Sequence, residues 1–204
     1  MSRKHKMPWV AVLGADGSGK STVIDGLIAH LASQKIDVVY QHWKPVLGGK
    51  DESNKGPVVD PHAQTPRGIV ASMLKVAVLL GIWRLSFWGD LGKQRREGKL
   101  ILFDRFYADL LNDPIRYRYG GSRAFASMLF KGMPKPDLII LLDAEAEVLY
   151  ARKPEVEMEE LKKIVSRYRL FIKNEKRGLL VNSDQEVQKV IADAVRAVEG
   201  VLSR

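Results

Sequence analysis

The chain has 204 residues, and its 33 lysines and arginines against 24 acidic residues give a net charge of +9. This length suits one domain with a substantial buried core, so we expect residues 1–204 to form a single domain. The sequence contains no cysteine, which excludes disulfides and thiolate metal sites and fits a cytoplasmic protein. The positive charge favours small anionic partners, and without a basic nucleic-acid-binding motif we expect no nucleic acid partner.

The first third of the chain predicts two strands, one helix and a long loop. Residues 9–14, "WVAVLG", are continuously apolar and end in glycine, which is typical of a buried strand. A helix is expected over 20–33 and a second strand over 36–43. Residues 44–68 are polar and rich in glycine and proline, which predicts a long loop.

Residues 68–89 are apolar enough to resemble a membrane-spanning helix, but the segment carries Lys75 and Arg84 in its interior. Charged residues at such positions are costly in lipid. We therefore predict a buried amphipathic helix with a polar continuation to about residue 98, and no transmembrane span. Peripheral contact with a membrane, or with a lipid-linked substrate, stays open as an alternative.

In the second half of the chain, strands and helices alternate. Strands are expected over 99–104, 136–143 and 178–184, and helices over 145–152, 155–176 and 185–202, with Pro154 separating the first two helices. Such alternation indicates a parallel sheet with helices on both faces. The predicted fold class is therefore α/β, with five parallel strands in a three-layer α/β/α arrangement.

The stretch "GADGSGKST", residues 14–22, meets the pattern G-x-x-x-x-G-K-[ST] between a predicted strand and a predicted helix. Backbone N–H groups of such a P-loop surround phosphate, and the following helix directs its positive end to the same point. We expect Lys20 to reach the β- and γ-phosphates, Ser21 to ligate Mg²⁺ and Thr22 to reach the α-phosphate. The predicted ligands are thus ATP and Mg²⁺. The predicted nucleotide-binding residues are Gly14, Asp16, Gly17, Ser18, Gly19, Lys20, Ser21, Thr22 and Arg152.

Among P-loop proteins, a small-molecule kinase fits this chain best. A GTPase would need the run N-K-x-D, which the sequence lacks, and a mechanical ATPase is usually larger. Asp104 and Arg105 end a predicted strand, where an open parallel sheet places its ligand. Asp104 could hold Mg²⁺ or orient an acceptor, and Arg105 could bind a phosphate.

The segments "GADGSGKST", "ILFDRFY" and "PKPDLIILLDAEAEVLYARK" resemble the thymidylate kinase family in order and spacing. The resemblance implies a P-loop kinase fold with a five-stranded parallel sheet, and phosphorylation of dTMP to dTDP by ATP. It also implies that Asp16 holds the acceptor's hydroxyl and that Asp104 and Arg105 serve the metal and the phosphoryl groups.

A lid over about residues 152–165 is likewise implied by the resemblance. Arg152 then packs on adenine and covers ATP. Some family members carry an arginine at the position of Gly17 and others bring a catalytic arginine from the lid, and the resemblance implies that this chain is of the second kind. The first candidates are Arg152 and Lys153 and the next are Arg167 and Arg169, with Arg152 taken as catalytic beside Lys20, Asp104 and Arg105.

The continuation after Arg105 departs from family members that read thymine. It contains Arg116, Tyr117, Arg118, Tyr119 and Arg123 beside two glycines. Guanidinium groups bind phosphates or carboxylates and aromatic rings stack on bases or sugars, although a basic surface loop also explains the pattern. The predicted acceptor-binding residues are Asp16, Arg105, Arg116, Arg118 and Tyr119.

Two further groups of polar residues follow predicted strands. His42 and Trp43 either line the acceptor pocket or occupy the core or rim. Asn182, Ser183 and Asp184 either lie near the adenine, as the resemblance implies, or provide the N-cap of the last helix.

The leading hypothesis for the function is a nucleoside monophosphate kinase that acts on dTMP. The alternatives are a related kinase for a sugar or lipid-linked intermediate of surface polysaccharide, which the resemblance also raises, and a non-catalytic nucleotide-binding regulator. By resemblance a homodimer is possible.

Overall fold

The structure is a computed structural model that describes residues 6–42 and 68–203. Along the chain the elements are β1 (Trp9–Leu13), α1 (Lys20–Ser33), β2 (Val38–His42), α2 (Ile69–Ser86), the π-helical segment η2 (Phe87–Leu91), α3 (Gly92–Arg96), β3 (Leu100–Asp104), α4 (Asp109–Asn112), α5 (Arg123–Lys131), β4 (Leu138–Asp143), α6 (Ala146–Arg152), α7 (Met158–Lys173), β5 (Gly178–Asn182) and α8 (Val187–Leu202). Each predicted strand is present within two residues of its expected start and end. Trp43 and nearly all of the predicted loop, residues 44–67, lie outside the described residues.

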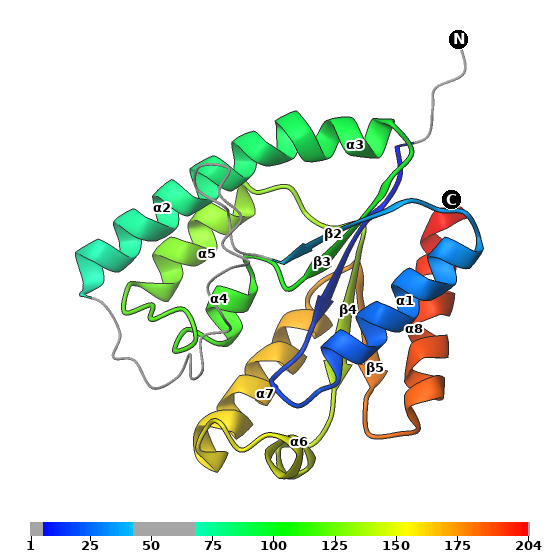
Figure 1. Ribbon diagram of the computed structural model, residues 1–204. Coiled ribbons are helices and arrows are strands. Elements are labelled where there is room, and N and C mark those ends of the chain that lie inside the picture. Colours follow the sequence, from blue (N-terminus) through cyan, green and yellow to red (C-terminus); the bar gives the residue numbers. More distant parts are fainter. Residues whose placement is uncertain (1–5, 43–67, 204) are drawn as a thin grey trace, which may run out of the picture.

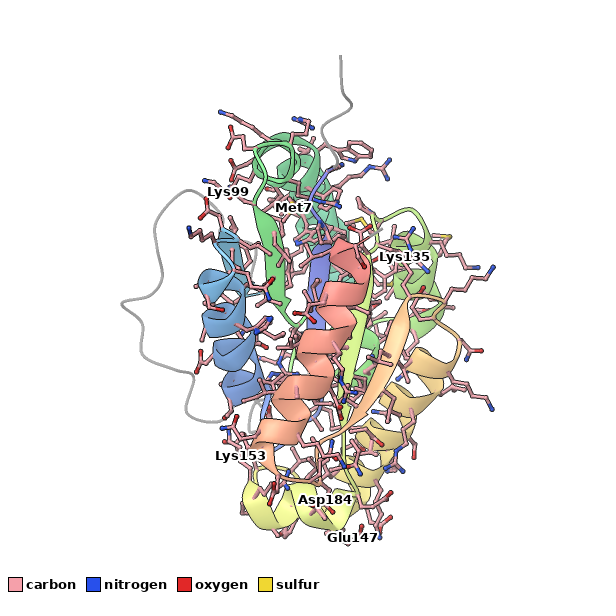
Figure 2. All side chains as sticks on the ribbon, turned by 90° about the vertical axis from the view of Figure 1, so that its right-hand side faces the viewer. Met7, Lys99, Lys135, Glu147, Lys153 and Asp184 are labelled. Atoms are coloured by element: carbon pink, nitrogen blue, oxygen red, sulfur yellow. The ribbon has the colours of Figure 1, made fainter. Side chains whose placement is uncertain are left out.

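The five strands form one all-parallel sheet in the order β2-β3-β1-β4-β5. Helices α1 and α8 cover one face, whereas α2, α5 and α7 lie on the other (Figure 1). The predicted three-layer α/β/α fold is therefore confirmed. Because all strands run in the same direction, their carboxyl ends meet at one edge of the sheet, where such folds place their ligands. Figure 2 shows Lys153 and Asp184 at this end of the molecule, whereas Met7 and Lys99, which precede β1 and β3, lie at the other end.

The central strand β1 explains why the sequence begins with an unbroken apolar run. It pairs with β3 on one side and β4 on the other, and helices cover both faces of the sheet, so β1 is fully buried. Trp9, Ala11 and Leu13 pack into the layer that contains α2 and α7. Val10 and Val12 pack against α1 and α8. The P-loop follows this rigid strand directly.

The apolar helix α2 differs from its prediction. Its inner side buries Val76, Leu80 and Trp83, and the Trp83 ring lies 5.2 Å from that of Trp9. Its outer side is also apolar, and Val70 and Leu85 are 80% and 76% exposed. The expectation of a buried amphipathic helix is thus wrong for the outer side, because two apolar stripes lie on opposite faces.

The continuous helical stretch Ile69–Arg96 is long and apolar enough to cross a membrane, judged by length and composition. Core helices of globular proteins can meet the same criterion, and the contact of Trp83 with Trp9 ties this one to the sheet. The expectation that the segment does not span a membrane stays a prediction.

Two helices were not predicted, and one predicted cap is wrong. The short helices α4 and α5 lie within residues 105–132, where the apolar residues show no clear helical period. Ser122 caps α5 by accepting a hydrogen bond from the N–H of Phe125, a signal that was available in the sequence. The N-cap of α8 is Glu186, not Ser183 or Asp184, because Ser183 instead donates its hydroxyl hydrogen to the carbonyl of Asp143.

Candidate active site

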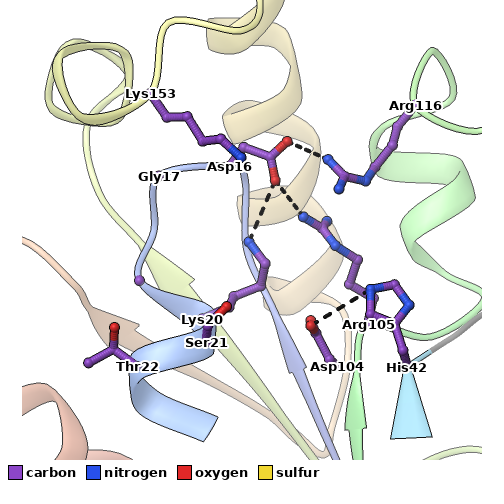
Figure 3. Close-up of a pocket in the computed structure, with 11 residues that line it drawn as sticks. Asp16, Gly17, Lys20, Ser21, Thr22, His42, Asp104, Arg105, Arg116 and Lys153 are labelled. Atoms are coloured by element: carbon purple, nitrogen blue, oxygen red, sulfur yellow. Dashed lines mark hydrogen bonds and ion pairs between the residues drawn. The ribbon is translucent and has the colours of Figure 1, made fainter. Parts of the chain in front are cut away.

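A cavity of about 380 Å³ opens at the carboxyl ends of the strands. Figure 3 shows the residues that line it. These are Asp16, Gly17, Gly19, Lys20, Ser21, Thr22, His42, Asp104, Arg105, Arg116 and Lys153. The cavity therefore brings together the P-loop, the ends of β2 and β3, the loop after α4 and the residue that follows α6.

The P-loop is shaped by close backbone approaches. A Cβ on Gly14 would lie 2.5 Å from Ser18 Oγ, and one on Gly17 would lie 2.8 Å from the carbonyl oxygen of Leu149. Gly17 also has a φ of 83°, a conformation that side chains strongly disfavour. The loop thus wraps the space at the start of α1 and packs under the last turn of α6.

Lys20 folds back onto this loop. Its Nζ donates hydrogen bonds to the carbonyl oxygens of Gly14 and Ala15 at 2.9 and 2.8 Å. Burial lowers the pKa of Lys20 to about 7, with Arg105 adding to the shift while Asp16 opposes it. An anion bound in the cavity would supply negative charge and hold the ammonium group protonated.

Asp16 is the centre of the charged cluster. Its Oδ1 accepts a hydrogen bond from Arg105 at 2.7 Å, and its Oδ2 accepts one from Arg116. Lys20 Nζ lies 4.0 Å from Oδ1. Burial by itself would raise the pKa of Asp16, but Arg105, Lys20 and Arg116 outweigh it and hold that pKa well below its usual value. The carboxylate therefore stays ionised and joins three cations (Figure 3).

Arg105 is held from behind by a fully buried carboxylate. Asp109 accepts a hydrogen bond from Arg105 at 2.7 Å and one from the hydroxyl of Tyr117 at 2.9 Å. The hydroxyl of Tyr168, on α7, donates to its other oxygen. Asp109 thus connects the turn after β3, the loop of Arg116 and helix α7. Arg105 lies outside α4 and has a φ of 68°, so the helical i, i+4 rule does not apply to this pair and the sequence did not predict it.

Asp104 lies at the end of β3 with one oxygen poised for a ligand. Oδ2 accepts a hydrogen bond from the Tyr40 hydroxyl at 3.4 Å and lies 3.8 Å from Nε2 of His42. Oδ1 is buried and has no hydrogen-bond partner among the described residues. A buried carboxylate oxygen without a donor fits a cation, and Ser21 lies in the same cavity.

Mg²⁺ is usually held by one or two protein oxygens together with substrate phosphates and water. Asp104 and Ser21 could therefore hold it. Over residues 6–42 and 68–203 no group of three or more histidine or acidic side chains has the arrangement of a metal site, and a magnesium site of this kind needs none.

Some of the predicted site residues line the cavity and others do not. Gly14 and Ser18 shape the P-loop from behind the cavity lining. Arg118 and Tyr119 do not line the cavity, and the Tyr119 hydroxyl donates to the carbonyl of Ser122. Arg152 also lies away from it and contacts Ser183 and Asp184. Their predicted roles stay predictions.

His42 and Lys153 line the cavity. From the sequence, the acceptor pocket was one of two places open to His42, and Lys153 stood beside Arg152 among the first lid candidates, of which Arg152 was taken as catalytic. The signal for His42 was its position at the carboxyl end of a predicted strand, where an open parallel sheet places its ligand. For Lys153 the signal was its position in the predicted lid, directly after the helix that follows β4.

A sequence model of the family described as "Thymidylate kinase" matches residues 12–204. The chain belongs to the thymidylate kinase family. It is 32% identical over 154 residues to a "Probable thymidylate kinase" of Pyrobaculum aerophilum, a match that covers 72% of this chain and 69% of that protein. The resemblance to the thymidylate kinase family is thereby confirmed, and with it the assignment as a P-loop kinase.

Two further relatives of this thymidylate kinase family member match nearly full length. A "Probable thymidylate kinase 1" of Saccharolobus solfataricus is 24% identical, over 93% of this chain and 96% of that protein. The "Uncharacterized ATP-binding protein YghS" of Escherichia coli is 23% identical, over 95% of this chain and 93% of that protein.

Proposed function

We propose that this P-loop kinase transfers the γ-phosphoryl group of ATP to the phosphate of dTMP. The observation that carries the proposal is the shared cavity: the P-loop residues Lys20 and Ser21 and the cluster of Asp16, Arg105 and Arg116 line the same space. A donor phosphate on the P-loop would therefore face an acceptor anion on the arginines. Two of the three relatives described above carry a thymidylate kinase name, and no observation favours a sugar or lipid-linked acceptor.

The roles follow from the chemistry of phosphoryl transfer, which needs positioning and positive charge more than covalent catalysis. An oxygen of the acceptor phosphate forms a bond to the γ-phosphorus while the bond to the β–γ bridging oxygen breaks. ADP leaves with that electron pair, and no proton has to move when the acceptor phosphate is fully ionised.

In this proposal the donor residues keep their predicted roles. Lys20 binds the β- and γ-phosphates, Thr22 lies near the α-phosphate, and Ser21 and Asp104 hold Mg²⁺. The metal, when bound, neutralises charge on the phosphate oxygens. On the adenine side, Arg152 is held by the carbonyl of Ser183 and by Asp184, at 3.2 and 3.3 Å.

On the acceptor side, Arg105 and Arg116 bind the acceptor phosphate and Asp16 accepts from its sugar hydroxyl. Asp16 pairs with both arginines, so a bound acceptor phosphate shares these two guanidinium groups with that carboxylate. Arg118 and Tyr119 remain predicted acceptor residues that would have to approach from outside the present cavity.

The test is an acceptor screen with purified protein, ATP and Mg²⁺, covering dTMP, dUMP, UMP, CMP and sugars. We expect ADP formation that depends on the acceptor and is fastest with dTMP. Turnover with a sugar and with no nucleotide would support the alternative acceptor. ADP formation that is independent of every acceptor, or absent, would support the nucleotide-binding regulator.

The predictions of one domain over residues 1–204, a lid over about 152–165, a cytoplasmic location and a possible homodimer are carried over unchanged. None of them enters the proposed chemistry.

A further inference from the structure

Four basic side chains, two in the predicted lid region and two on the helix that follows Pro154, are the predicted candidates for supplying a cation to the transferring phosphoryl group. They are Arg152, Lys153, Arg167 and Arg169, and all four belong to the described part of the chain. P-loop kinases need such a cation because negative charge builds on the phosphoryl oxygens in the transition state. Because position 17 is a glycine, Lys20 is the one cationic side chain that the P-loop, residues 14–22, provides.

The three arginines are engaged elsewhere. Arg169 pairs with Asp143 at 2.9 Å and with Glu145 at 2.8 Å. Arg167 pairs with Glu160 at 3.1 Å, and Arg152 contacts Asp184 at 3.3 Å. Within the described residues, none of these arginines lines the cavity.

Lys153 lines the cavity together with the P-loop. Figure 3 shows its side chain extending from the end of α6 toward Asp16. The cause lies in the backbone: α6 ends at Arg152, and Lys153 adopts an extended conformation with φ −154° and ψ 91°. This change of direction separates the two neighbours, so that Arg152 contacts Ser183 and Asp184 while Lys153 points across the P-loop.

The end of α6 is fixed in this place by Gly17. A side chain there would meet the carbonyl of Leu149 at 2.8 Å and Cβ of Arg152 at 3.5 Å, so the absence of a Cβ lets the last turn of α6 pack on the P-loop. The Lys153 side chain is 49% exposed and its Nζ lies 3.0 Å from Glu155 Oε1. An exposed ion pair of this kind is weak, so Nζ can exchange Glu155 for a phosphate oxygen.

We propose that Lys153, rather than an arginine, is the catalytic cation of the lid, and that it binds the γ-phosphoryl oxygens as the group moves from ATP to the acceptor. The inference rests on the proposed phosphoryl transfer and names a residue for one part of it. Arg152 then acts on the nucleotide side, next to the loop that follows β5.

The test compares Lys153→Met with three variants. Lys153→Arg restores a cation, Arg152→Met removes the neighbouring one, and Lys162→Met is the matched control. Lys162 is another lid lysine, which pairs with Glu147 and Glu159 and does not line the cavity. Each variant is assayed for dTMP phosphorylation and, by calorimetry, for binding of Mg-ADP with and without aluminium fluoride, a mimic of the transferring group.

We expect Lys153→Met to lower kcat by about 100-fold or more while leaving the affinity for Mg-ADP alone nearly unchanged, because the contact is made in the transition state. It should also lose most of the increase in affinity that aluminium fluoride produces in the wild type. Lys153→Arg should recover part of both, and Lys162→Met should match the wild type. Arg152→Met should weaken the binding of Mg-ADP but keep the increase in affinity that aluminium fluoride produces.

The results separate this inference from the proposed function. If the wild type phosphorylates no nucleotide, the proposed function fails, and the calorimetric comparison still decides the role of Lys153. If the wild type is active but Lys153→Met equals Lys162→Met in kcat, the assignment to Lys153 is overturned. The assignment is also overturned if aluminium fluoride raises the affinity for Mg-ADP equally in the wild type and in Lys153→Met, or raises it in neither.

Discussion

The donor and acceptor halves of the cavity are built in opposite ways. The phosphate-binding part of the donor half comes from one continuous stretch, residues 14–22, in which backbone and glycines set the shape. The acceptor half is assembled from side chains of distant segments, in which Asp16 of that stretch pairs with Arg105 at 2.7 Å and with Arg116. A continuous backbone cradle is specified locally, whereas a side-chain cluster depends on the whole fold. The donor chemistry is therefore readable from sequence and the acceptor identity is not.

The largest expected effect is in the donor half. Lys20→Ala should lower the rate of phosphoryl transfer by at least about 100-fold, because it removes the ammonium group that binds the β- and γ-phosphates. The fold should persist, since Lys20 contacts the loop and not the core. Transfer assays with thermal unfolding check both expectations, and Lys189→Ala, an exposed lysine on α8, is the control. A full rate in Lys20→Ala would remove the P-loop from the chemistry.

The second effect concerns the metal. Chelation with EDTA should abolish transfer, and Asp104→Asn should raise the Mg²⁺ concentration for half-maximal rate by about tenfold or more, because one ionised ligand oxygen is lost. Magnesium titrations of both proteins measure this shift. An unchanged titration curve would mean that the unpartnered Oδ1 of Asp104 serves the acceptor and not the cation.

The third expected effect separates the acceptor half of the cavity from the donor half, because it changes the affinity for the acceptor and not that for ATP. Arg116→Met should weaken acceptor binding by about 10- to 100-fold, as expected for loss of a charged hydrogen bond, with little change in the affinity for ATP. Arg118→Met is measured in the same way. Both arginines were predicted from the sequence to bind the acceptor, but of the two only Arg116 lines the cavity. Equal losses of ATP and acceptor affinity in Arg116→Met would contradict the division into halves.

The smallest expected effect concerns Tyr117, whose hydroxyl donates to the buried Asp109 behind the acceptor site. Tyr117→Phe should lower the free energy of unfolding by about 1 kcal/mol, because Asp109 loses one donor and keeps Arg105 and Tyr168. Acceptor affinity should fall modestly with it, since the loop of Arg116 is less well fixed. Urea unfolding with Tyr150→Phe, a more exposed tyrosine on α6, as the control provides the measurement. An unchanged midpoint would show that the hydrogen bond contributes little.

The sequence predicted those parts of the fold that depend on local pattern. The apolar runs gave all five strands, and the glycines with Lys20 and Ser21 gave the P-loop. It did not predict which sides of α2 are buried, because both stripes of that helix are apolar and only packing against Trp9 distinguishes them. The short helices α4 and α5 were missed because their apolar spacing is too brief to show a period.

In the site, the strand-end rule predicted where two residues lie, and their roles stay predictions. Asp104 is the last residue of β3 and Arg105 follows it, and both line the cavity. The contrast between Arg152 and Lys153 could not be predicted, because the two are adjacent in sequence and diverge only through the backbone conformation at the end of α6. The link from Asp109 to Tyr168 spans 59 residues and has no signature in the chain.

The buried carboxylate of Asp109 has a consequence for engineering. Because Tyr117 anchors the middle of the 113–119 loop to it, we expect the path of the loop to survive exchange of position 116, and exchange of position 118 by residues that tolerate its φ of 52°. A library that randomises these two positions and keeps Tyr117 would sample new acceptors on an intact scaffold. A library that also randomises position 117 would mix altered specificity with poor expression.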